Sequence, residues 1–119
     1  MKRILALDDD PVNNHIMEYY LCKAGFEVIT VNNTQEALHL IEQEVFDLLI
    51  SDFVLQEMNG VDLMNILLNR FGSDRIKVVF FSSEDDRAVR QKVLELGAVA
   101  WISKPYTNTY FIKRITSLL

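Results

Sequence analysis

Four short apolar runs of this sequence are each followed by side chains suited to metal or phosphate chemistry. These side chains are Asp8 and Asp9 after the first run, Asp52 after the third, Ser82 and Ser83 after the fourth, and Lys104 after the fifth. Carboxylates gathered at one point would repel one another by about 1 to 4 kcal/mol per pair near a protein surface. Such a group requires a cation, and oxygen ligands of this kind favour Mg²⁺, with Mn²⁺ as the alternative.

Each of these residues also has a purely structural interpretation. An aspartate can cap the helix that follows it, although one residue, Asp10, is enough for that purpose. Asp52 can open the turn that leads to Gly60. Ser82 can cap a helix, and Lys104 can be an ordinary surface charge. The prediction of a site therefore depends on the whole set and not on any one member.

The elements that position these residues form a regular alternation. Apolar runs predict five strands, at residues 3–7, 27–31, 47–51, 76–81 and 99–103. An amphipathic stretch with helical spacing follows each run; Asp10 and Pro11 are typical of the start of the first helix, and Thr34 is the expected cap of the second. Buried strands alternating with helices predict an α/β fold, a doubly wound five-stranded parallel (βα)5 sheet. Ligands bind such sheets beyond the carboxyl ends of the strands, where the residues above would meet.

Composition limits the other possibilities. A chain of 119 residues suits one domain, residues 1–119. With 17 acidic and 12 basic residues, the net charge of -5 argues against nucleic acid or an anionic membrane as the main partner. Cys22 is expected to be a buried thiol, and His15 and His39 to be surface residues. No signal peptide or membrane-spanning run is apparent, so we expect a cytoplasmic location.

Four stretches of the sequence, in this order, resemble one family. They are ILALDDDP, DLLISDFVLQEMNG, VVFFSSEDD and AWISKPY. Together they resemble the receiver domain of two-component response regulators over essentially the whole chain. The resemblance implies the flavodoxin-like strand order 2-1-3-4-5. The resemblance implies that Asp52 is the phosphoacceptor, and that Asp9 binds Mg²⁺ directly and Asp8 mostly through water. The backbone carbonyl of Val54 would be a further ligand, and Lys104 would contact the phosphoryl group.

The resemblance also implies a switch. Ser82 takes the place of the family's switch Ser/Thr, and Trp101 that of an aromatic residue that rotates inward after phosphorylation. Lys104-Pro105 resembles the family's cis peptide bond. Trp101 is bulkier than the usual residue, and Gln56 replaces a frequent proline. Val54 and Glu84 flank the route of water to the phosphate, while Glu57 and Asp62 are expected to be solvated.

Phosphoryl transfer needs positioning and charge neutralisation more than covalent assistance. We expect Asp52 to accept the phosphoryl group from a histidine kinase or a histidine phosphotransfer protein, as a switch that assists its own phosphorylation and dephosphorylation and not as an enzyme. The donor is expected at the first helix near Asn13, Asn14 and Met17. An unknown downstream target is expected at the face of the fourth and fifth helices and fifth strand, which carries Arg87, Arg90, Gln91, Tyr110, Lys113 and Arg114. The chain would be a monomer or a phosphorylation-dependent dimer.

Three other interpretations remain. An aspartate-nucleophile phosphatase would share the Asp8-Asp9-Asp10 run, but residues 106–119 lack the late acidic motif of such enzymes. A flavodoxin-like cofactor domain would share the fold, but it would need a phosphate loop rich in hydroxyls and glycines after the first strand. A receiver-like module could also bind partners without being phosphorylated.

Overall fold

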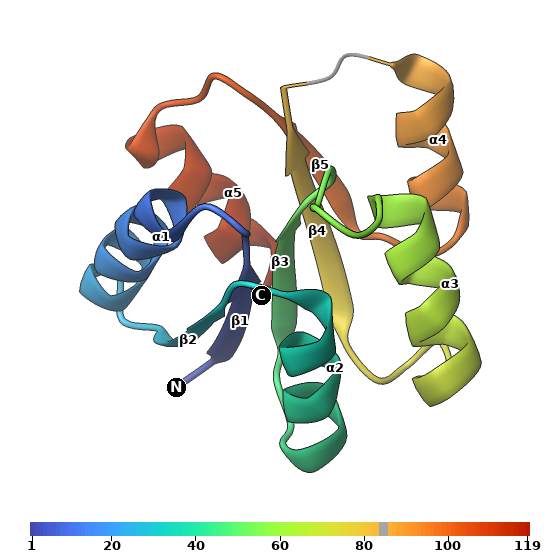
Figure 1. Ribbon diagram of the computed structural model, residues 1–119. Coiled ribbons are helices and arrows are strands. Elements are labelled where there is room, and N and C mark those ends of the chain that lie inside the picture. Colours follow the sequence, from blue (N-terminus) through green and yellow to red (C-terminus); the bar gives the residue numbers. More distant parts are fainter. Residues whose placement is uncertain (84–85) are drawn as a thin grey trace.

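The computed structural model describes residues 1–83 and 86–119. Strands and helices alternate along the chain (Figure 1). They are β1 (Arg3–Leu7), α1 (Pro11–Lys23), β2 (Glu27–Val31), α2 (Thr34–Gln43), β3 (Leu48–Asp52), α3 (Gly60–Phe71), β4 (Lys77–Ser82), α4 (Arg87–Glu95), β5 (Ala100–Ser103) and α5 (Asn108–Leu118).

The strands form one parallel sheet in the order β2-β1-β3-β4-β5, which confirms the predicted fold class and strand order. Helices α1 and α5 cover one face of the sheet, and α2, α3 and α4 cover the other (Figure 1). Such a two-sided arrangement follows from right-handed crossovers between parallel strands. All five carboxyl ends therefore lie along the same edge of the sheet.

Alternate strand residues supply two separate cores. In β1, Leu5 and Leu7 belong to the core beneath α2, α3 and α4, whereas Ile4 and Ala6 belong to the core beneath α1 and α5. All four are fully buried. Successive side chains of a strand point to opposite faces, so a strand buried on both faces must be apolar throughout.

Helix caps hold the loops at the carboxyl edge. The carboxylate of Asp10 accepts a hydrogen bond from the backbone N–H of Val12 at 2.9 Å, which confirms its predicted role. The expected cap at Thr34 is wrong: the side chain of Asn33 caps α2, accepting from the N–H of Glu36 at 2.8 Å. Asparagine caps helices at least as well as threonine and Asn33 comes first along the chain, so Thr34 becomes the first helical residue; it is buried.

Two strands end one residue later than predicted. Asp52 is the last residue of β3 and pairs with Phe81, and Ser82 is the last residue of β4 and pairs with Ser103. Both side chains are thereby held by the hydrogen-bonded sheet and not by a loop.

The prediction of a buried Cys22 is wrong, because this side chain is exposed. Helix α1 buries one stripe, formed by Asn14, Met17 and Leu21. Cys22 follows Leu21 and so lies about 100° around the helix from it, outside the stripe. His15 and His39 are exposed, as expected. Within residues 1–83 and 86–119, no helix combines the length and apolar character needed to span a membrane.

Candidate functional site

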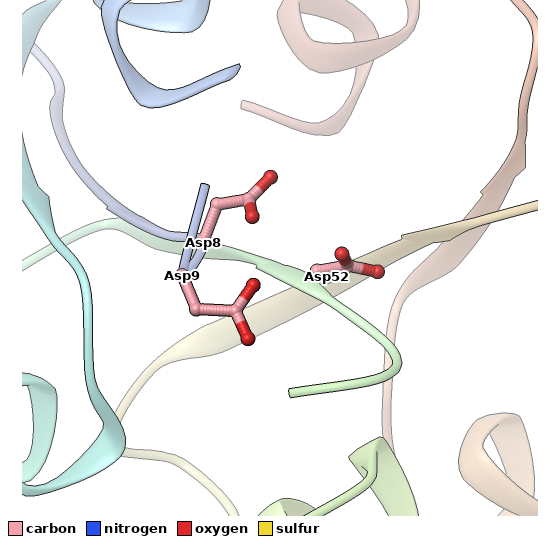
Figure 2. Close-up of side chains that lie close together, drawn as sticks. All are labelled: Asp8, Asp9 and Asp52. Atoms are coloured by element: carbon pink, nitrogen blue, oxygen red, sulfur yellow. The ribbon is translucent and has the colours of Figure 1, made fainter. Parts of the chain in front are cut away.

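An acidic cluster lies at the carboxyl edge of the two central strands. Asp8 and Asp9 leave the end of β1, and Asp52 ends the neighbouring strand β3 (Figure 2). One carboxylate oxygen from each residue lies within 4.8 Å of the other two. Asp8 is fully buried, Asp52 is half-buried and Asp9 is exposed, so the cluster has an inner and an outer side.

Burial disfavours the negative charge of this cluster. Burial raises the pKa of the Asp8 carboxyl, and the charge of Asp52 raises it further, although the backbone N–H of Asp10 donates to Asp8 Oδ1 at 2.9 Å. The second oxygen of Asp8, Oδ2, is buried and has no hydrogen-bond partner in the described part of the chain. An unpartnered buried carboxylate oxygen is costly, and a hard cation would satisfy it. The donor set therefore fits Mg²⁺ or a similar ion.

The ammonium of Lys104 lies close to Asp52. Its Nζ atom is 3.9 Å from Asp52 Oδ2 and 4.7 Å from the ring centre of Phe81. Burial raises the pKa of Asp52, and the nearby Lys104 lowers it. The backbone N–H of Lys104 donates to the carbonyl of Ser82 at 2.8 Å, which ties the end of β5 to the end of β4. The cis bond between Lys104 and Pro105 confirms the expectation from the sequence.

The other predicted site residues lie along the same edge. Ser82 is buried at the end of β4, the strand next to Asp52. The backbone N–H of Val54 is 3.4 Å from Asp52 Oδ1, and its side chain is exposed. Its carbonyl remains a predicted ligand. Glu84, expected beside the route of water to the phosphate, lies outside the described residues.

The loop between β3 and α3 has contacts that were not predicted. Glu57 is exposed, but its carboxylate accepts a hydrogen bond from the backbone N–H of Thr34 at 2.9 Å, and this bond lowers the pKa of Glu57. Asp62 is exposed too, and it forms a capping box with Asn59 at the start of α3. Both acids therefore fix the loop that carries Val54 instead of being merely solvated.

Tyr106 was missed by the analysis of the sequence. Its ring stacks on Phe111 with 5.0 Å between ring centres. Burial, followed by the charges of Asp8 and Asp52, raises the pKa of its hydroxyl to about 12. The phenol is therefore neutral and can donate a hydrogen bond near the acidic cluster. Its position directly after Lys104-Pro105 was the available signal.

The face expected to meet a phosphohistidine donor needs correction. Asn14 is buried, and its amide donates to the backbone carbonyls of Asp8 and Val31 at 2.8 and 2.9 Å. Met17 is buried too, in the core beneath α1 and α5. The spacing along α1 does not distinguish a polar residue that ties two loops together from one that faces solvent. A groove of about 340 Å³ does open beside Lys104, and Asn13 and Met17 of the expected donor face both line it, so the correction concerns Asn14. Its lining also includes Ile16, Tyr20, Lys104 and Tyr106.

Trp101 differs from the expected rotating switch residue in one respect. It already lies inward, with 9% of its surface exposed. Its indole lies 5.0 Å from the ring of Phe53, centre to centre, at an angle of 50°. Burial of an aromatic side chain of this size contributes roughly 4 to 6 kcal/mol.

The raised pKa values predict a pH-dependent stability in the absence of divalent cations. The pKa values of Asp8 and Asp52 lie above the ordinary value of 3.8 in the folded chain, so both carboxyls hold protons more tightly there than in the unfolded chain. Their contribution to the free energy of unfolding therefore falls as pH rises from 3.8 through the raised values. We expect Asp52→Asn to stabilise the chelator-treated protein by about 0.5 to 2 kcal/mol at neutral pH. The gain should vanish below pH 3.8.

Urea unfolding of the wild type and of Asp52→Asn, measured across this pH range with a chelator present, checks the prediction. A loss of stability in Asp52→Asn at neutral pH would mean that the carboxylate is a structural group.

Comparison with known proteins decides the family. Residues 4–116 match the response regulator receiver domain. The chain belongs to this family. Receiver domains are phosphoacceptor switches of two-component signalling and do not turn over a substrate as an enzyme does. The family match favours the receiver interpretation over the phosphatase and cofactor-domain alternatives.

Individual relatives agree with this assignment. The chain is 31% identical to the transcriptional regulatory protein CpxR of Escherichia coli K12, over 100% of this chain and 50% of CpxR. It is 30% identical to the probable transcriptional regulator ycf29 of Pyropia yezoensis, over 98% of this chain and 53% of the relative. The receiver thus spans about half the length of the curated relatives it matches.

Solved structures show the same fold. The chemotaxis response regulator CheY4 of Vibrio cholerae superposes with a TM-score of 0.90 at 25% identity, covering 100% of this chain and 99% of CheY4. A CheY-like receiver domain protein from Methanospirillum hungatei gives a TM-score of 0.88 at 27% identity, covering 98% and 92% of the two chains.

Proposed function

We propose that this receiver accepts a phosphoryl group on Asp52 from a phosphohistidine of a histidine kinase or histidine phosphotransfer protein. A carboxylate oxygen of Asp52 bonds to phosphorus as the bond from phosphorus to the donor imidazole nitrogen breaks, and that nitrogen keeps the electron pair and takes a proton. The observation that carries this proposal is the position of Asp52, close both to two further carboxylates and to the ammonium of Lys104.

Mg²⁺ held by Asp8, Asp9, Asp52 and the Val54 carbonyl would neutralise oxygens of the transferring group. The unpartnered oxygen of Asp8 supports this assignment. Lys104 orients and neutralises the phosphoryl group as a second positive charge. The hydroxyl of Ser82 then donates to a phosphoryl oxygen, and Ser82 and Trp101 convey the change to the surface of α4, β5 and α5.

Two faces would meet partners. The donor would dock at the groove between α1 and the loop after Lys104, where Ile16 and Tyr20 are exposed. A downstream target would dock on the surface of α4, β5 and α5, where Arg87, Gln91, Tyr110 and Lys113 are exposed. The chain spans about half the length of its curated relatives. The downstream effect of a whole protein that carries this receiver is therefore part of this proposal.

Intact-mass measurement after incubation with acetyl phosphate and Mg²⁺ tests the proposed function. The wild-type chain should gain one phosphoryl group, and neither Asp52→Ala nor the wild type with a chelator should gain any. Ser83→Ala is the control for a nearby hydroxyl, and it should be phosphorylated normally. If a phosphohistidine donor also leaves the wild type unmodified, the protein acts by binding alone.

A further inference from the structure

The residue directly after the proposed phosphoacceptor contacts the aromatic residue of β5. Phe53 is buried, and its ring lies 5.0 Å from that of Trp101 and 5.9 Å from that of Phe80, edge to face with Phe80. Its backbone N–H donates to the carbonyl of Phe81 at 2.9 Å, which holds the backbone of Phe53 against β4. Phe53 thus joins the end of β3 to β5 across the intervening strand.

No spare room surrounds the ring of Phe53 on the side of α3. A Cβ atom on Gly60 would lie 2.5 Å from one ring carbon of Phe53 and 2.8 Å from a ring carbon of Phe80. Contacts this short require a neighbour to move. Gly60, Phe80 and Trp101 therefore enclose the Phe53 ring, and a displacement of this ring must be taken up by a neighbour.

We propose that Phe53 is a positioning residue that couples the state of Asp52 to the position of Trp101. This proposal rests on the proposed function, because the change at Asp52 is its phosphorylation. A rearranged chain after Asp52 moves the Phe53 ring, and Trp101 follows because the packed rings leave no gap between them. The contact between Phe53 and Trp101 thus links Trp101 directly to the end of the phosphoacceptor strand. This link acts in addition to any effect of Ser82.

Trp101 fluorescence can report this coupling, because it is the one tryptophan of the chain. Emission and intact mass are measured on the same samples, before and after incubation with acetyl phosphate and Mg²⁺. The wild type should gain a phosphoryl group and change its Trp101 emission. Phe53→Leu should gain the phosphoryl group and lose the emission change.

Phe46→Leu is the matched control. Phe46 is buried in the same core, but it precedes β3, whereas Phe53 follows β3 at the opposite end of the strand. It should keep the emission change despite a comparable loss of packing. Gly60→Ala provides a test without phosphorylation: its Cβ atom should displace Phe53 and shift the emission of Trp101 in a chain whose circular dichroism remains that of the folded protein.

The outcomes separate the two proposals. A wild-type chain that gains no phosphoryl group from acetyl phosphate or from a phosphohistidine donor contradicts the proposed function, and the coupling with it. A phosphorylated wild type with unchanged emission contradicts the coupling alone. A full emission change in Phe53→Leu that disappears in Ser82→Ala would assign the relay to Ser82 and overturn the role of Phe53.

Discussion

Lys104→Ala slows phosphorylation of the chain by acetyl phosphate by about 100- to 1000-fold, the usual effect of removing one group that stabilises transition-state charge. The ammonium is 3.9 Å from Asp52 and faces the same carboxylate that would attack phosphorus. Without it, the negative oxygens of the transferring group face the acidic cluster with one neutralising charge fewer. The rate of appearance of the phosphorylated mass, at fixed Mg²⁺, measures the effect.

Lys92→Ala is the matched control for Lys104→Ala. Lys92 is exposed in the last turn of α4 and makes no ion pair with Asp52 among the described residues. Its substitution removes the same charge from the chain and should leave the rate unchanged. Equal rates for Lys104→Ala and the wild type would show that Lys104 has no part in phosphoryl transfer.

Mg²⁺ raises the free energy of unfolding of the wild type, and Asp9→Asn removes most of this gain. A ligand that binds the folded state alone stabilises it by about 2.7 kcal/mol at 100 times its dissociation constant. The gain should be clear here because burial disfavours the charged forms of Asp8 and Asp52, and the neighbouring carboxylates Asp52 and Asp9, respectively, disfavour them further. A bound cation would relieve both effects. Urea unfolding with Mg²⁺ or with a chelator measures the difference.

Asp10→Asn is the control for the adjacent carboxylates. The side chain of Asp10 caps α1, and asparagine caps helices about as well as aspartate. This variant should therefore keep both its stability and its response to Mg²⁺. A full Mg²⁺ response in Asp9→Asn would mean that Asp9 is not a ligand of the cation.

The order of apolar runs was enough to predict the parallel sheet. The central strands β1, β3 and β4 are buried over most of their length and are largely apolar, whereas the intervening stretches show helical spacing. The carboxyl ends of parallel strands share one edge, and Asp9, Asp52, Ser82 and Lys104 follow or end those strands. The candidate site was therefore predictable from position along the chain.

Helix spacing gave less certain answers about single side chains. The buried thiol expected at Cys22 is exposed, and the donor-facing amide expected at Asn14 is buried. Both residues lie on α1, whose apolar residues are not confined to one face: Ile16 is 40% exposed and Met17 is 4% exposed. A helix with apolar residues on both sides does not indicate which side meets the sheet.

The sequence by itself determined the fold class, the family and the carboxyl edge where the polar residues gather, because these follow from local periodicity and from the order of the strands. The tertiary structure decided which side chains touch across that edge. The bond from Thr34 to Glu57, the stacking of Tyr106 on Phe111 and the packing of Trp101 on Phe53 are such contacts. The last of these joins residues 48 positions apart (101 minus 53). Such contacts depend on the twist of the sheet and the paths of the loops, which no local pattern specifies.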